Sequence, residues 1–157
     1  MTGEIFRLAL LCALGTLLIV AAITDLRSRI ISNRLNLAVA ALAPAWWLAW
    51  GLDLWPDMAV QLLVGAIVFA IFAGLFALGM MGGGDVKLLG ALALWFPWQV
   101  VMSLIVLMAM LGGAVTIATL IHHRIAKKPG QPEIPYGVAI SIAGLWLIGE
   151  RYFNHFA

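Results

Sequence analysis

The sequence predicts an all-α polytopic membrane protein with six transmembrane helices, in a single domain that takes up residues 1–157. Hydrophobic residues make up 64% of the chain and charged residues only 10%, and the mean hydropathy is +1.08. Because a soluble domain carries about 25% charged residues, this composition excludes an ordinary soluble fold. The apolar residues also fall into stretches close to the roughly 20 residues that a helix needs to cross the hydrocarbon core.

The first expected span covers about residues 5–24 and leads into a basic segment. A cleaved signal peptide is the alternative interpretation, since small residues near the end of this stretch resemble a cleavage site. The leading residues carry Glu4 as well as Arg7, so they lack the purely positive region of a signal peptide. A transmembrane helix is therefore favoured.

Five further spans follow, separated by turn signals and polar loops. They are expected at about residues 35–50, 58–78, 86–96, 99–121 and 135–152. Pro56 suits the start of the third helix, and Pro97 ends the fourth. The fourth stretch has only eleven residues, which rise about 17 Å against a hydrocarbon core of about 30 Å. If that helix reaches the far surface, Asp85 at its start lies inside the membrane.

Charge and aromatic residues predict the orientation of the bundle. Six spans put both termini on one side, together with Arg7 and Arg151. Seven cationic residues fall on the other side, which the positive-inside rule assigns to the cytoplasm: Arg27, Arg29, Arg34, Lys87, Arg124, Lys127 and Lys128. Six of the seven tryptophans fall near the expected outer loops, as in an interfacial belt: Trp46, Trp47, Trp50, Trp55, Trp95 and Trp98, with Trp146 the exception.

The chain centres on an acid that follows a run of glycines, Gly79-Met80-Met81-Gly82-Gly83-Gly84-Asp85-Val86-Lys87. Each glycine costs about 1 kcal/mol in a helix interior, so the run predicts non-helical backbone that bends or is closely approached. An ionisable side chain at membrane depth needs a partner. Asp25, at the end of the first span, falls on the same side of the membrane, so the two carboxyl groups are expected to meet.

Two such carboxyl groups predict acid–base chemistry. In a low-dielectric site they share one proton, which provides a general base and a general acid together. The base takes a proton from water as the water attacks a carbonyl, and the acid assists the carbonyl oxygen and the leaving nitrogen. This is aspartyl peptide hydrolysis, for which we expect no metal and no other cofactor. Glycine backbone beside the pair would let an extended substrate segment lie alongside it.

The motifs resemble a known family. Gly82-x-Gly84-Asp85-x-Lys87 resembles the GxGD motif of membrane-embedded aspartyl proteases. Asp25, followed by Ile31-Ser32-Asn33, resembles the other aspartate motif of the type IV prepilin peptidases, in which Ile-Pro-Asn follows the aspartate. Pro135-Tyr136-Gly137 is similar to a third, softer family feature. The match extends over nearly the whole chain in motif order, spacing and number of spans, although Ser32 stands where the family usually has proline.

The resemblance implies a multi-pass enzyme of the bacterial inner membrane, with catalytic residues Asp25 and Asp85 facing the cytoplasm. Its partner would be a prepilin or pseudopilin, which carries a short basic leader ahead of a hydrophobic helix. Further residues matching the motifs are expected to bind substrate or shape the loops: Gly82, Gly83, Gly84, Lys87, Asn33, Pro135, Tyr136 and Gly137. The chain lacks the cysteine-bearing segment of the larger bifunctional members. It therefore resembles the short branch serving tight-adherence or Flp-type pili, which implies cleavage without N-methylation.

Other functions remain open at this stage. A different GxGD protease would cut inside a transmembrane segment, whereas a small transporter or channel subunit would use Asp25 and Asp85 to relay protons or bind cations. A scaffold of a secretion machine would need neither carboxyl group. Asp85 could serve as a helix N-cap and Asp25 as a juxtamembrane acid paired with a nearby arginine. Lys87 could orient the chain or tune the acid pair.

Several functions are disfavoured. The net charge is only +2, and membrane orientation explains most of the nine Lys and Arg residues, so we expect membrane lipid and no nucleic acid as a partner. The single Cys12 offers no disulfide or CxxC pair. His122-His123 has no carboxylate or cysteine at ligand spacing, so no metal site is predicted. The sequence does not indicate an oligomeric state.

Overall fold

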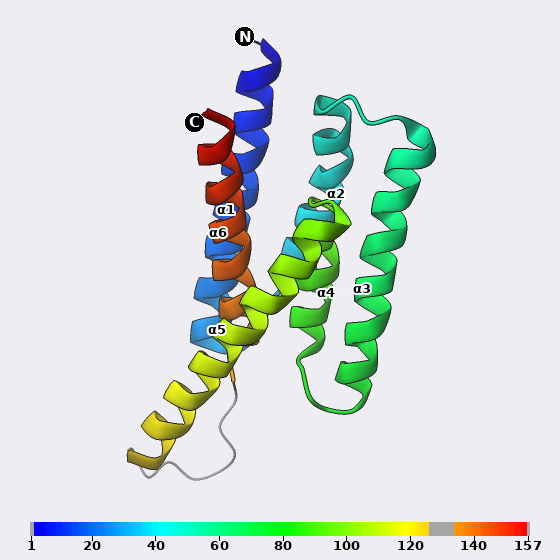
Figure 1. Ribbon diagram of the computed structural model, residues 1–157. Helices are drawn as coiled ribbons and strands as arrows, with labels where there is room; N and C mark the ends of the chain where they lie inside the picture. The colour runs from blue at the N-terminus through cyan, green and yellow to red at the C-terminus, as the bar shows by residue number, and fades with distance from the viewer. Residues whose placement is uncertain (1, 126–133, 157) are drawn as a thin grey trace.

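A computed structural model describes residues 2–125 and 134–156, and every regular element in them is helical (Figure 1). Along the chain these elements are α1 (Thr2–Ser28), α2 (Asn33–Ala49), the short wide turn η1 (Leu54–Met58), α3 (Ala59–Ala77), α4 (Gly83–Ala93), α5 (Trp98–Ile125) and α6 (Tyr136–Phe156). The all-helical prediction is confirmed for this part of the chain, and each expected span overlaps one α-helix. Lys127 and Lys128, two of the expected orienting cations, lie outside the described residues.

Three stretches are long and apolar enough to cross a membrane: Gly3–Ser28, Leu54–Ala77 and Trp98–Ile125. The protein is thus an integral membrane protein, and a six-span arrangement remains a prediction. The observed helix α1 is longer than expected at both ends, and Asp25 lies within its last turn.

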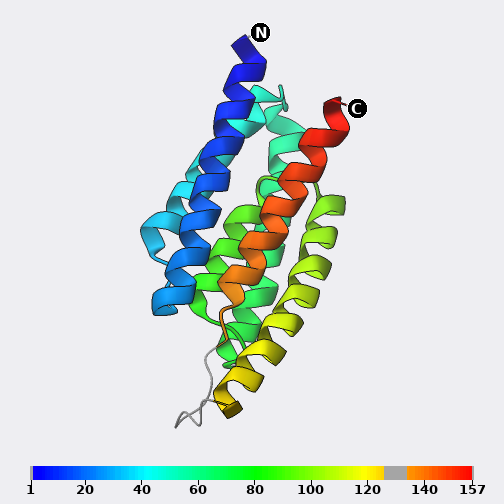
Figure 2. The same ribbon diagram turned by 90° about the vertical axis from the view of Figure 1, so that its left-hand side faces the viewer.

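The helices form an elongated bundle in which α1 and α6 lie side by side (Figures 1 and 2). Helix α4 packs against α2, α3 and α6, while α5 packs along α6 and leans away from the rest. One end of the bundle contains Asp25, Asp85 and Gly137, and we call it the aspartate end. The opposite end contains both chain termini together with Trp50 and Trp95, and we call it the tryptophan end.

Helix α4 forms the centre of the bundle. Eight of its eleven residues are buried, from Asp85 to Ala93, as expected for a helix that is apolar on all sides. Glycines let its neighbours approach closely, because in a membrane bundle small residues bring backbones together. A Cβ atom on Gly65 of α3 would lie 2.4 Å from Leu94, and one on Gly90 of α4 would lie 3.1 Å from Phe69.

The glycine run is only partly non-helical. Gly79 adopts a φ of +71° that favours glycine, and the turn ends at Gly82, which is the N-cap of α4. The prediction of non-helical backbone was wrong for Gly83 and Gly84, which form the first turn of α4. Their missing side chains serve close packing: a Cβ on Gly83 would lie 3.2 Å from Phe76, and one on Gly84 would lie 3.2 Å from Ile31. Asp85 is therefore in the first helical turn and is not the N-cap.

Gly144 provides a test of this close packing. A Cβ there would lie 2.8 Å from Leu92 and 3.0 Å from Leu18, and both leucines are fully buried and cannot swing aside. We expect Gly144→Val to destabilise the bundle by about 1–3 kcal/mol through overpacking, measured as thermal unfolding in detergent. Gly149→Val is the matched control, because it changes the same helix where a Cβ meets no atom within 4 Å. Equal losses of stability in the two variants would contradict the packing argument.

Candidate active site

Asp25 lies in the last turn of α1, and its side chain is only 4% exposed. The backbone N–H of Val138, in the first turn of α6, donates a hydrogen bond of 3.1 Å to Oδ2 of Asp25. The first N–H groups of a helix have no partner within it, and they favour negative charge nearby. The start of α6 therefore provides a binding position for the Asp25 carboxyl group.

Asp85 approaches the same point from α4 and is 7% exposed. The backbone amide of Gly82 hydrogen-bonds to its carboxyl group. The backbone amide of Gly137 lies within hydrogen-bonding reach of both Asp85 and Asp25, and the charge of Asp25 acts on Asp85. Two acids sixty positions apart in the sequence thus meet at one buried site, as the sequence predicts.

Ile31 lies where the ends of α1, α4 and α6 meet; the sequence analysis names it as a motif residue but gives it no role. The side chain is buried in the connection between α1 and α2. A Cβ on Gly84 would lie 3.2 Å from the Cβ and the carbonyl oxygen of Ile31. A Cβ on Gly137 would lie 2.5 Å from Ile31 Cδ1 and 2.9 Å from Asp25 Oδ2. Gly84 and Gly137 are therefore required where the backbones of α4 and α6 pass Ile31 and the acids.

The connection before α2 explains how serine replaces the family's proline. Arg29 adopts a φ of +56°, and its N–H donates to the Asp25 carbonyl oxygen at 3.0 Å, which ends α1. Ser32 is the N-cap of α2, and its Oγ accepts a hydrogen bond of 3.2 Å from the Leu35 N–H. Serine fills this role well, so the substitution keeps a defined start of α2.

Asn33 and Lys87 lie together at the edge of the site. Lys87 Nζ donates a hydrogen bond of 2.8 Å to Asn33 Oδ1, and the contact is solvent-exposed. It ties the first turn of α2 to the first turns of α4. The two residues predicted from separate motifs are thus direct partners.

Pro135 and Tyr136 have different surroundings. Pro135 is buried immediately before α6, where a proline ends the preceding connection and is compatible with a helix start. The ring of Tyr136 faces α5, since a Cβ on Gly112 would lie 3.3 Å from it. Of the Pro135-Tyr136-Gly137 motif, Gly137 is the residue that contacts the acids, and Tyr136 anchors α5 to α6.

Asn36 is a buried polar residue of α2 that the sequence analysis missed. Its Nδ2 donates a hydrogen bond of 3.1 Å to the carbonyl oxygen of Gly84, next to Asp85. Its Oδ1 is buried and has no hydrogen-bond partner. A polar residue within the apolar stretch at 35–50 was the available signal. Elsewhere, the described residues contain no group of three or more His, Cys, Asp or Glu side chains that could hold a metal ion.

The chain is similar in sequence to known proteins. A sequence profile of the type IV leader peptidase family matches residues 12–117, which include both aspartates. A protein of Bacillus subtilis (strain 168) named prepilin leader peptidase/N-methyltransferase is 26% identical over 141 residues, which cover 90% of this chain and 56% of that protein. The chain thus spans about half the length of this curated relative. No solved structure matches the chain.

The unpaired oxygen of Asn36 leads to a prediction about stability. Replacing Asn36 by leucine removes a hydrogen bond worth about 0.5–1.5 kcal/mol, and it also removes a buried acceptor whose lack of a partner costs about 1–3 kcal/mol. We expect Asn36→Leu to change the unfolding free energy by less than about 1 kcal/mol, measured by thermal unfolding in detergent. A loss above about 2 kcal/mol would mean that Oδ1 has a partner in the folded protein.

Proposed function

Since the chain belongs to the type IV leader peptidase family, we propose that it is a membrane-embedded aspartic endopeptidase that uses Asp25 and Asp85 to activate water. Its substrate is a type IV or Flp-type prepilin or pseudopilin, and the cut removes the short basic leader. The observation that carries the proposal is the backbone amide of Gly137, which lies within reach of both carboxyl groups.

The hydrogen bonds support different roles for the two acids. We assign Asp25 as the general base, because the Val138 N–H and the start of α6 stabilise a carboxylate there. Asp85 is then the protonated partner that donates to the scissile carbonyl oxygen. Asp25 takes a proton from water as the water oxygen attacks the carbonyl carbon. When the C–N bond breaks, the leaving nitrogen receives a proton from the acid pair.

The charge distribution supports an active site that faces the cytoplasm. The described cations Arg27, Arg29, Arg34, Lys87 and Arg124 all belong to the aspartate end, whereas Arg7 and Arg151 belong to the other. The positive-inside rule then assigns the aspartate end to the cytoplasmic side of the inner membrane in a six-span arrangement. The short helix α4 holds Asp85 below that surface, within reach of a substrate that is itself in the membrane.

The substrate's extended segment fits the turn before α4 better than the helical glycines. Gly83 and Gly84 are already packed against Phe76 and Ile31, so they do not offer free backbone. Gly79 and Gly82 are exposed, and Gly82 hydrogen-bonds to Asp85. At these two glycines the backbone carries no side chain, so a peptide backbone can approach the acid pair closely there.

We propose cleavage without N-methylation. The curated relative is named as a methyltransferase as well as a peptidase. The α1–α2 connection consists only of Arg29–Ser32, and the other connections between the described helices are also short. None of them is long enough to form an inserted domain of its own.

The central test replaces each acid by its amide. We expect Asp25→Asn and Asp85→Asn each to lower leader removal at least about 100-fold, because general acid–base catalysis contributes about 10²–10⁴-fold. The measurement is cleavage of a co-expressed pilin precursor in membranes, with mass spectrometry of the new N-terminus. Asp53→Asn, an exposed acid in the loop at the tryptophan end, is the matched control and should cleave normally. Cleavage by either active-site variant would refute the mechanism, and a methylated product would refute the absence of methyl transfer.

Gly137 tests the geometry of the pair. An added Cβ would meet Asp25 Oδ2 at 2.9 Å and Ile31, so Gly137→Ala should displace the carboxyl group from the α6 amides. Because misplacement by about 1 Å can cost about 100-fold, we expect cleavage to fall about 10- to 100-fold. Gly113→Ala in α5 is the control, since its Cβ meets no atom within 4 Å. Unchanged cleavage by Gly137→Ala would show that the close contact is unimportant.

A further inference from the structure

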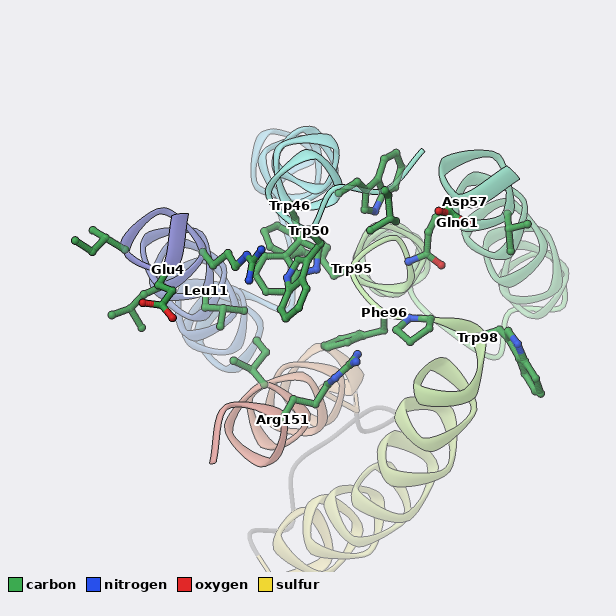
Figure 3. A pocket seen from close by; sticks show the side chains of 18 residues that line it. Glu4, Leu11, Trp46, Trp50, Asp57, Gln61, Trp95, Phe96, Trp98 and Arg151 are labelled. Atoms are coloured by element: carbon green, nitrogen blue, oxygen red, sulfur yellow. The ribbon is translucent and has the colours of Figure 1, made fainter. Parts of the chain in front are cut away.

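A second site lies at the tryptophan end, far from the acids. It is a pocket of about 790 Å³ (Figure 3). Its lining residues come from α1, α2, α3 and α6, from the loop that follows α4, and from the segments next to these elements. Arg7 on its wall and Asp25 belong to the same helix and are eighteen residues apart. This corresponds to a rise of about 27 Å, close to the thickness of the hydrocarbon core.

The pocket exists because α4 is short. Helix α4 ends at Ala93, and the chain turns through Trp95 and Phe96 before α5 begins at Trp98. Trp95 and Phe96 line the pocket from this central position, while α1, α2 and α6 continue around it. The centre of the bundle is therefore left without a helix at this end. Trp95 is held there because its Nε1 donates a hydrogen bond of 2.9 Å to the carbonyl oxygen of Val39.

Two arginines give the pocket a positive wall. The guanidinium of Arg7 lies 4.2 Å from the ring centre of Trp50, and its Nε donates a hydrogen bond of 2.9 Å to the Ala49 carbonyl oxygen. The hydrogen bond uses one of the five N–H donors of Arg7, and the two contacts together fix the orientation of its guanidinium group. Arg151 points inward from the end of α6 (Figure 3). Arginine forks suit phosphate oxygens, to which they donate in pairs.

The remaining lining is largely aromatic. The ring of Trp46 lies 5.6 Å from that of Trp50 in an edge-to-face contact and 5.7 Å from that of Trp95 in a tilted contact, measured between ring centres. Phe96 also lines the pocket. Indole rings favour the boundary between hydrocarbon and headgroups, where one edge is apolar and the other is hydrated. The acids Glu4 and Asp57 also line the pocket, so its lining carries charges of both signs.

We propose that this pocket binds a membrane phospholipid, with the phosphate between Arg7 and Arg151 and an acyl chain against Trp46, Trp95 and Phe96. The ligand has to be an amphiphile, because the site pairs two guanidinium groups with an aromatic interior. The pocket lies at the depth of the lipid headgroups in the leaflet opposite to the aspartate end. The lipid fills the space that α4 leaves open, and so it joins α1 and α6 to α2.

Native mass spectrometry of the delipidated protein in detergent tests this proposal without using proteolysis. Dioleoylphosphatidylglycerol is compared with dioleoylglycerol, which has the same chains without phosphate, and with inorganic phosphate. We expect one phosphatidylglycerol per chain, bound at least about tenfold more tightly than dioleoylglycerol, since hydrogen bonds to charged groups contribute about 1.5–3 kcal/mol. Inorganic phosphate should not displace it.

Arginine variants locate the site. Arg7→Gln and Arg151→Gln should each weaken phosphatidylglycerol binding about tenfold. Arg124→Gln removes an exposed arginine from α5 outside the pocket, so it should bind like the wild type. Equal binding of dioleoylglycerol, displacement by phosphate, or unchanged binding in both pocket variants would each overturn the proposal. Because the readout is lipid binding, such a result would leave the peptidase proposal untouched.

Discussion

The main constraint on the bundle is electrostatic, because two carboxyl groups are buried close together with little water around them. Buried acids of like charge repel one another, and each needs donors to replace the water it has lost. The first turn of α6 supplies those donors, through the Val138 N–H to Asp25 and the Gly137 amide facing both acids. The ends of α1, α4 and α6 therefore have to converge, and the packing of the three helices follows from that convergence.

Close approach of backbones is what makes this convergence possible. Gly84 and Gly137 pass Ile31, and Gly144 passes Leu18 and Leu92. In lipid the hydrophobic effect does not drive helices together, so such contacts must contribute through van der Waals packing. The glycines of the site and those of the bundle core thus have one physical role. They let α6 approach α1 and α4 closely, and they let α4 approach the connection between α1 and α2.

Periodicity, composition and motif spacing were enough to predict the helices and the pairing of Asp25 with Asp85, because both depend on local pattern or on topology. They did not identify Asn36 or Val138, and they gave no role to Ile31, because the contacts of these residues are with partners more than forty positions away. Gly83 and Gly84 were misassigned because helix propensity describes helix interiors, and at a first turn the need for close contact prevails. Ser32 was an unexplained departure until its capping bond to Leu35 was seen.

The shortness of α4 also has a consequence for biogenesis. An eleven-residue segment with Asp85 and Lys87 near its start is a poor insertion signal by itself, since charged residues oppose partitioning and the segment does not reach across the bilayer. Helix α3 is long and strongly apolar, and it packs closely against α4 at Gly65 and Gly90. The placement of α4 therefore depends on its contacts with α3, which is the strongly apolar member of the pair.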